Sequence, residues 1–180
     1  MILSRRTSAE QLHPTPPFPR REGVREENEA IMTALVGSYD PKRKDGQLIR
    51  YPLAAGAHVF KGALVCVAVA TGFLAPGADA AGVVCVGVAY EEGNNVAGGV
   101  QYDGSVSSGA AGAVSVRVQT VGLYQYHKVG AVQADVGRQA FLLDDNTVST
   151  VATADNIKCG VVGGLVDSGT VAVLIDGRIS

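Results

Sequence analysis

The side chains of this chain that are able to do chemistry are three histidines, three cysteines and short runs of acidic residues. A catalytic histidine needs a nucleophile or a carboxylate within hydrogen-bond reach, whereas His58 and His127 stand at the start and the end of expected strands. The chain has no Gly-x-Ser-x-Gly motif and no histidines at metal-ligand spacing. Glu91 and Glu92 are adjacent, and neighbours on a strand face opposite sides. The sequence therefore predicts that this chain is not an enzyme.

The cysteines and one acidic run are the remaining candidates for a metal site. Cys66 and Cys85 each stand between two valines, and Cys159 follows a lysine. Their odd number, without a Cys-x-x-Cys motif, argues against a disulfide framework and a zinc site, so we expect reduced, buried, small apolar side chains. Residues 144–146 read Asp-Asp-Asn, but an EF-hand calcium loop needs further oxygen ligands and a later glutamate, which residues 147–149 do not supply. No metal and no cofactor is expected.

Turns and strands alternate in the middle of the chain. Asp135 is able to accept backbone N–H groups, and Gly137 is able to adopt a positive φ, which predicts a compact turn. Gln139–Leu143 is too short for a stable helix and rich enough in Phe and Leu for a strand. Residues 144–147 then predict a reverse turn, because Asp and Asn bond their own backbone, and Val148 restarts a strand pattern.

The elements that position these side chains are short strands. Hydrophobic residues make up 47% of the chain and aromatic residues only 6%, with 23 glycines and no tryptophan, which favours a core of Val, Ala and Leu between tight turns. Gly160, Gly163 and Gly164 indicate a bulge or a sharp bend. The sequence predicts an all-β fold, a small barrel or sandwich of short Gly-punctuated strands with an extended N-terminal arm. Further expected strands lie within residues 59–70, 73–75, 83–89, 113–118, 123–127, 159–166 and 170–175.

Three segments differ in composition and divide the chain. Residues 1–31 are rich in Pro, Arg and Glu and predict a low-complexity arm. Two explanations stay open for this arm: it is disordered, or it lies upstream of a true translation start at Met32, since a pair of glutamates shortly before that methionine can be encoded by a ribosome-binding site. Residues 32–52 predict an extended basic arm, and residues 53–180 a β-barrel-like domain.

The charges are unevenly distributed along the chain. The net charge of −2 gives no case for a nucleic-acid binder. Residues 53–180 contain six Lys/Arg and ten Asp/Glu and are acidic by four, whereas Ser38–Pro52 contains four Lys/Arg and two Asp and is basic by two. No apolar run reaches the roughly 18 residues of a membrane span, and the N-terminus lacks the apolar core of a signal peptide. Neither nucleic acid nor membrane is an expected partner, and reduced cysteines fit an intracellular place of assembly.

From Leu53 to Ile175 the order of sequence pieces resembles the capsid cement, or head decoration, proteins of tailed bacteriophages. The matching pieces read AAGAHVFKGALVCV, GVVCVGVAYEE, AVSVRVQTVGLYQYH, AVQADVGRQAFLLDDNTVSTVA and CGVVGGLVDSGTVAVLID. The most specific piece is the Asp-Val-Gly turn followed by a strand and an Asp-Asp-Asn-Thr-Val hairpin. Two features depart from the family pattern: the extension before Met32, and Glu91–Gly112, an expected long surface loop that is richer in Gly and Ser.

The resemblance implies a structural virion protein that binds the outside of an assembled phage head and stabilises it, without catalysis. Its implied partner is the lattice of the major capsid protein, and its implied locations are the capsid exterior and, during assembly, the host cytoplasm. Homo-oligomers are also expected, with a trimer favoured. An alternative of a different class stays open: a β-barrel carbohydrate- or ligand-binding module. The candidate stacking residues of such a module are Tyr90, Tyr102, Tyr124 and Tyr126.

The candidate capsid contacts lie in the basic segment Ser38–Pro52, which combines cations with two apolar anchors. These contacts are Lys42, Arg43, Lys44, Ile49, Arg50 and Tyr51. We expect the segment to be loosely held in the free protein and ordered on the shell, so that its removal leaves the domain folded. The alternative is that Leu48–Pro52 closes the domain as an edge strand, a position in which Pro52 is tolerated.

Overall fold

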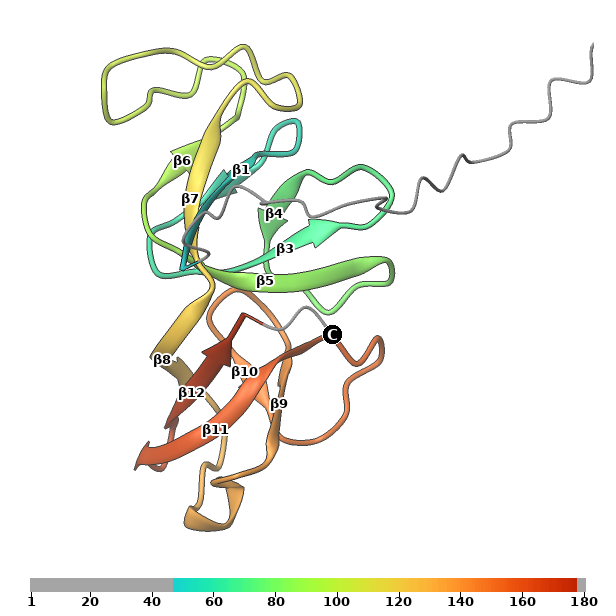
Figure 1. The fold of residues 1–180 in the computed structure, drawn as a ribbon, viewed down its shortest axis with the longest axis vertical. Helices are drawn as coiled ribbons and strands as arrows, with labels where there is room; N and C mark the ends of the chain where they lie inside the picture. Colours follow the sequence, from blue (N-terminus) through green and yellow to red (C-terminus); the bar gives the residue numbers. More distant parts are fainter. Residues whose placement is uncertain (1–46, 178–180) are drawn as a thin grey trace, which may run out of the picture. The chain divides into compact units, whose positions relative to one another are not determined.

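Two five-stranded antiparallel sheets make up most of the structure (Figure 1). The computed structural model of the 180-residue chain describes residues 47–177. The chain divides into two units, residues 1–42 and 43–180, of which the first lies outside the described residues. Twelve strands and one turn of 3-10 helix are described, so the predicted all-β fold is confirmed. No helix in residues 47–177 has the length and the apolar composition needed to cross a membrane.

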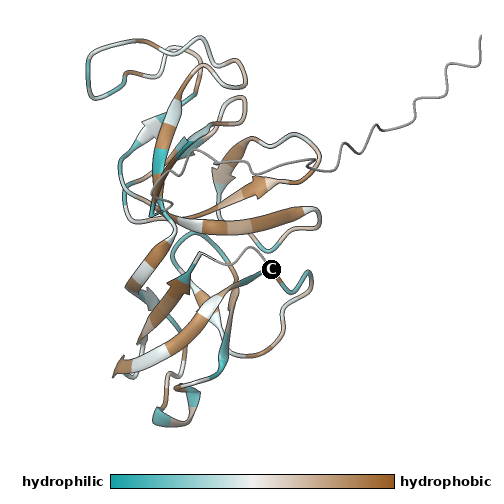
Figure 2. Cartoon of the chain, viewed as in Figure 1, coloured by the Kyte–Doolittle hydropathy of each residue, from teal (hydrophilic) through white to brown (hydrophobic). Residues whose placement is uncertain are grey.

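The first sheet contains β1 (Leu48–Pro52), β3 (Leu64–Ala68), β4 (Leu74–Pro76), β5 (Val83–Ala89) and β7 (Ser115–Gln119). Its strand order is β1-β7-β5-β3-β4, so β1 and β4 are its edges. The alternation in β7 places Val116 and Val118 on one face, and both are fully buried. Apolar residues run along nearly all of β5 (Figure 2), which is typical of a strand covered on both faces.

The second sheet contains β8 (Val121–His127), β9 (Gln139–Leu142), β10 (Val148–Ser149), β11 (Lys158–Asp167) and β12 (Thr170–Asp176). Its strand order is β10-β9-β11-β12-β8. β11 and β12 pair as a hairpin, and the register of β11 shifts between Lys158 and Gly160 and between Val162 and Gly164. These shifts confirm the predicted bulge. A separate two-stranded pair joins β2 (His58–Val59) to β6 (Gly93–Asn94).

The predicted alternation of turns and strands is confirmed between β8 and β10. A 3-10 turn, Gln133–Asp135, precedes β9, and Gly137 has a φ of +85°. The Asp135 carboxylate accepts the N–H of Val132 at 2.9 Å. In the following turn the Asp144 carboxylate accepts the N–H of Asn146 at 2.8 Å. Local turn chemistry therefore accounts for Asp135 and Asp144 in these two turns.

The two sheets share one hydrophobic core. Leu64, Cys66 and Cys85 of the first sheet pack in the same buried cluster as residues of the second sheet. Hydrogen bonds join the sheets at the surface of this core: the N–H of Leu64 donates to the carbonyl of Asp145 at 2.8 Å, and the Tyr126 hydroxyl donates to the carbonyl of Gly62 at 3.0 Å. A second buried cluster lies within the first sheet and its loops. Each sheet therefore covers apolar residues of the other.

Two details of the domain differ from the simplest expectation. Of the predicted barrel and sandwich, two open sheets with a shared core fit the sandwich and not a closed barrel, in the described part of the chain. The domain also begins before residue 53, because β1 belongs to the first sheet. The expected arm over residues 1–31, and the part of the expected basic arm before residue 47, lie outside the described residues.

Candidate docking surface

Half of the predicted contact residues lie on β1, the edge strand of the first sheet. Ile49, Arg50 and Tyr51 belong to this strand, whereas residues 42–44 lie outside the described part of the chain. β1 pairs with β7 over its whole length in antiparallel register. An edge strand also presents a second row of backbone groups, with which another chain is able to pair.

Ile49 and Tyr51 share one face of β1, but only Tyr51 packs against the core, and Ile49 is 37% exposed. Ile49 lies opposite Val118 and Tyr51 opposite Val116, two fully buried residues. Tyr51 packs against the core cluster of the first sheet, and burial raises the pKa of its phenol. The expectation that this segment is free of the domain is therefore wrong for β1: its backbone is paired, and Tyr51 contacts the domain's own core. The edge-strand alternative is the one that the structure supports.

Arg50 lies on the opposite face of β1, directly across from Arg117 of β7. Two like charges in this position repel each other, and Glu91 compensates for them. Its carboxylate accepts hydrogen bonds from Nε and Nη2 of Arg117, at 2.9 and 2.5 Å, and from the Arg117 backbone N–H at 3.0 Å. The hydrogen bonds from Arg117, together with the charge of Arg50, lower the pKa of Glu91.

Tyr90 extends this cluster of charges. The guanidinium carbon of Arg117 lies 4.9 Å, and the ammonium of Lys61 5.9 Å, from the centroid of the Tyr90 ring, within cation–π range. We call Arg50, Lys61, Tyr90, Glu91 and Arg117 the Arg117 cluster. It holds three cations and one carboxylate on a domain that is acidic as a whole. Such a surface is suited to binding an acidic protein surface.

The sequence did not identify Tyr90 and Arg117 as parts of this surface. They come together because β5 and β7 are neighbours in the sheet, a pairing that the sequence does not specify. Glu91 and Glu92 do act separately, as predicted: Glu91 binds Arg117, and Glu92 lies 2.8 Å from Nε2 of His58. One feature of the sequence could have pointed to this surface. Arg117 is a charged residue at an outward-facing position of a strand with alternating apolar residues.

The four tyrosines proposed as a sugar-stacking platform are differently placed. Tyr126 is buried and its hydroxyl bonds the carbonyl of Gly62, so its ring is not accessible to a ligand. Tyr124 is half-buried in the same strand, and Tyr90 is 40% exposed with Lys61 and Arg117 near its ring. Tyr102 alone of these four is fully exposed. The carbohydrate-binding alternative therefore keeps two exposed rings, those of Tyr90 and Tyr102.

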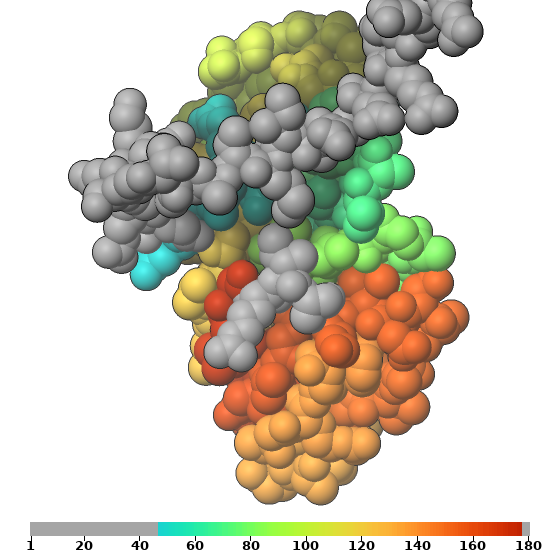
Figure 3. Space-filling view, turned by 45° about the vertical axis from the view of Figure 1, so that its right-hand side comes forward, coloured from blue at the N-terminus to red at the C-terminus, as the bar shows by residue number. Residues whose placement is uncertain are grey.

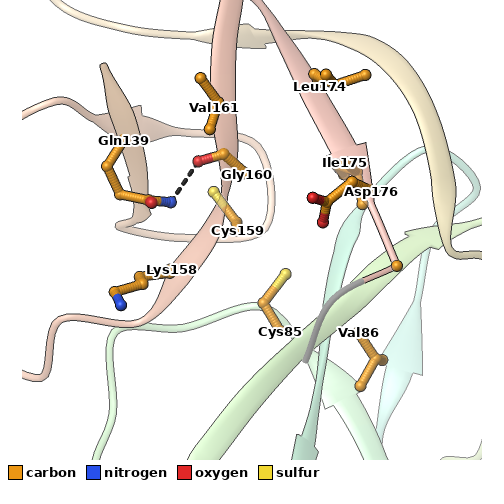
Figure 4. Close-up of a pocket in the computed structure, with 11 residues that line it drawn as sticks. Cys85, Val86, Gln139, Lys158, Cys159, Gly160, Val161, Leu174, Ile175 and Asp176 are labelled. Atoms are coloured by element: carbon orange, nitrogen blue, oxygen red, sulfur yellow. Dashed lines mark hydrogen bonds between the residues drawn. The ribbon is translucent and has the colours of Figure 1, made fainter. Parts of the chain in front are cut away.

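A cavity of about 250 Å³ lies where β5 meets β9, β11 and β12 (Figure 4). Cys85 and Cys159 line it from different sheets. Burial raises the pKa of Cys159 to about 12, and the hydrogen bond to Cys66 together with burial raises the pKa of Cys85, so neither thiol ionises near neutral pH. The Gln139 side-chain amide donates to the carbonyl of Gly160. These two thiols are therefore structural groups and not activated nucleophiles.

Comparison with known proteins identifies no relative of this chain. No family model, no curated protein and no solved structure matches it. Within residues 47–177 no group of three or more His, Cys, Asp or Glu side chains is placed to hold a metal ion. The Arg117 cluster is the candidate site, and its excess of cations is the property from which a partner can be proposed.

Proposed function

We propose that this chain is a structural virion protein, a capsid cement or decoration protein that binds the outside of an assembled phage head and stabilises it. The observation that carries the proposal is the position of the Arg117 cluster. It lies beside β1, which follows the basic segment with residues 42–44 directly in the sequence. The basic residues 42–44 therefore precede Arg50 of this cluster closely in the sequence. The resemblance of the sequence pieces to capsid cement proteins makes a capsid lattice the expected acidic partner.

Binding to a repeating lattice explains how individually weak contacts are able to hold the protein on a shell. A protein that binds many identical sites, or that binds as a homo-oligomer, adds weak contacts into a stable association. Exposed charge pairs contribute little each, and three cations with a short basic segment fit such a role. The partner is the major capsid protein, the location is the capsid exterior after assembly in the host cytoplasm, and no catalysis is involved.

The join between the two sheets also suits a protein that holds a shell together. The Asp79 carboxylate accepts hydrogen bonds from the Thr153 hydroxyl at 2.8 Å and from the N–H of Ala154 at 3.0 Å. Together with the bonds of Leu64 and Tyr126 across the shared core, these contacts fix one sheet against the other. A cement protein must keep its points of contact at a fixed separation, which such a join provides.

Co-sedimentation with empty, expanded shells of the phage that encodes this chain tests the proposal. We expect saturable binding of the full chain that weakens as salt rises, because exposed charges are screened. A truncation that starts at Gln47 removes residues 42–44 and keeps β1, and it should bind more weakly. The double variant Arg50→Glu, Lys61→Glu should also bind more weakly at low salt.

The control for these variants is Lys158→Glu, a charge reversal on an exposed residue of the second sheet. It should bind like the unchanged chain, since it lies outside the Arg117 cluster. Circular dichroism would establish that every variant is folded. A folded, full-length chain that fails to sediment with shells at low salt would overturn the proposed function.

A further inference from the structure

Cys66 of β3 and Cys85 of β5 lie directly opposite each other on neighbouring antiparallel strands. Opposite residues of such strands have Cα atoms about 4.5–5.5 Å apart and side chains on the same face of the sheet. A disulfide bond joins Cα atoms about 4.4–6.8 Å apart. Both thiols are free and buried, and both belong to the core cluster that the two sheets share. The backbone geometry therefore suits a disulfide between them without a movement of either strand.

A shift in the register of the two strands creates this pair. Gly87 lies opposite Val65. A regular ladder would then place Val86 opposite Cys66, but the register shifts at this point and Cys85 takes that position. Val86 packs instead in the separate core cluster of the first sheet. An irregularity of this kind changes the direction in which a side chain points, and here it places two thiols face to face.

The two thiols differ in acidity. A hydrogen bond between them lowers the pKa of Cys66, against the opposing effect of burial, and raises the pKa of Cys85. Cys66 is therefore the thiol that ionises more readily, while Cys85 keeps its proton. Formation of a disulfide needs a thiolate as the attacking group and a second thiol beside it. This pair supplies both.

A small reagent is able to reach the pair through the cavity of about 250 Å³ that Cys85 lines. The sulfur of Cys85 points into this cavity (Figure 4), and its hydrogen-bond partner Cys66 lies next to it. On the outside, the surfaces of β5 and of the second sheet meet (Figure 3), and Cys66 is only 1% exposed. Hydrogen peroxide is close to water in size, whereas the reagents that label thiols are bulkier. Slow labelling of the folded protein is therefore compatible with oxidation by peroxide.

We propose that Cys66 and Cys85 are a redox-sensitive pair, which hydrogen peroxide converts into a disulfide that links β3 to β5 within the shared core. The inference is independent of the proposed function. In a reducing cell interior the pair stays as two thiols, and oxidising surroundings favour the disulfide. The new bond restricts the unfolded chain, so the oxidised domain is harder to unfold.

The reaction proceeds in two steps. The Cys66 thiolate attacks one oxygen of the peroxide and the O–O bond breaks, which leaves a sulfenic acid on Cys66 and a hydroxide that takes up the proton released by Cys66. The sulfur of Cys85 then attacks the sulfenic sulfur. The S–S bond forms, the S–O bond breaks, and the hydroxide leaves as water with the proton of Cys85. The two thiols lose two electrons and two protons, and one peroxide becomes two waters.

Cys159 is a weaker candidate for the same bond. It lies on β11, which belongs to the second sheet and is not paired with β5. Its thiol donates a hydrogen bond to the carbonyl of Ala140 at 3.4 Å, and burial raises its pKa to about 12. The fold therefore favours the bond between Cys66 and Cys85 over one that includes Cys159.

The test is oxidation of the full-length, reduced chain by hydrogen peroxide without denaturant. Free thiols, titrated afterwards in denaturant, should fall from three to one per chain. Cleavage at Asp79, which lies between the two cysteines in the sequence, should leave the fragments that contain Cys66 and Cys85 joined by a disulfide. The oxidised chain should unfold at a higher urea concentration than the reduced chain, and a reductant should reverse this shift.

Two variants control the test. Cys159→Ser keeps the pair, so peroxide should remove both of its thiols and raise its urea midpoint as in the unchanged chain. Cys66→Ser lacks one partner, so it should form no internal disulfide and show no such shift. Each variant is compared with its own reduced form, so a change in stability caused by the substitution itself does not affect the result.

Several results would overturn the inference. One is a disulfide between Cys85 and Cys159, and another is the same mixture of pairings from folded and from urea-unfolded chains. Three thiols that stay free in peroxide, or a Cys66 oxidised to sulfinic acid without a bond to Cys85, would also contradict it. A failure of the chain to bind shells would overturn the proposed function and leave this inference in place.

Discussion

The ammonium of Lys128 lies 2.9 Å from the carboxylate of Asp135, and both side chains are almost completely removed from solvent. The second carboxylate oxygen of Asp135 accepts the hydroxyl of Thr150 at 2.8 Å. Asp135 thereby joins the end of β8 to the segment that follows β10. The hydrogen bond from Lys128, followed by that from the N–H of Val132, lowers the pKa of Asp135 to about 2.

This pKa predicts how the stability depends on pH. A carboxyl group whose pKa is lower in the folded than in the unfolded chain stabilises the fold above its unfolded pKa, near 4, and loses that effect as the pH falls to about 2. Asp135→Asn should therefore reduce the free energy of unfolding most at pH 5 and above. Urea titrations between pH 2 and pH 7 measure this difference. A difference that stays constant over that range would contradict the assignment.

A pair of truncations tests whether β1 belongs to the domain. A chain that starts at Gln47 keeps β1 and should unfold at the same urea concentration as the full chain. A chain that starts at Leu53 lacks β1 and uncovers Val116 and Val118, so it should lose about 3 kcal/mol or more through lost apolar burial and hydrogen bonds. Equal stability of the two truncations would show that β1 contributes nothing to the fold.

Gly87 is predicted to be the most sensitive glycine in the first sheet. Its φ is +144°, and an added Cβ would collide with the carbonyl oxygen of Gln119. Gly87→Ala should destabilise the fold by about 3 kcal/mol, through steric overlap in addition to backbone strain. Gly130→Ala is the control, because Gly130 also has a positive φ of +62° but no atoms near the added Cβ, and it should cost about 1 kcal/mol. An equal loss of unfolding free energy in the two variants would contradict the proposed steric overlap with the carbonyl of Gln119.

The cysteines should be unreactive in the folded protein. Cys66, Cys85 and Cys159 are free and buried, as the sequence predicted, and the raised pKa values of Cys85 and Cys159 keep these thiols protonated near neutral pH. Labelling with a thiol reagent should be slow without denaturant and should reach three thiols in denaturant. Rapid labelling of any one under native conditions would show that the core opens readily.

The strands of this fold were predictable because their signals are local. Alternating valines identified β7, and the turn residues Asp135 and Gly137 identified the boundaries of β9. The order of strands within each sheet is set by contacts between distant residues, which no local pattern specifies. For β1 the sequence leaves an arm and an edge strand both open, because its charge favours a free segment while its pairing with β7 depends on a strand more than 60 residues later.

The candidate site was predictable only in part, for the same reason. Arg50 stands in a visibly basic segment and was identified. Glu91 and Arg117, which define the geometry around it, are 26 residues apart in sequence and meet only in the folded sheet.

The central claim is that this chain stabilises an assembled shell from outside, and the heat-induced disassembly of that shell tests it most directly. Empty, expanded shells would be heated with and without saturating full-length protein, and disassembly followed by light scattering. We predict a higher disassembly temperature with the protein, and a smaller increase with a folded variant that combines Arg50→Glu and Lys61→Glu. An unchanged disassembly temperature in the presence of bound, folded, full-length protein would contradict the claim.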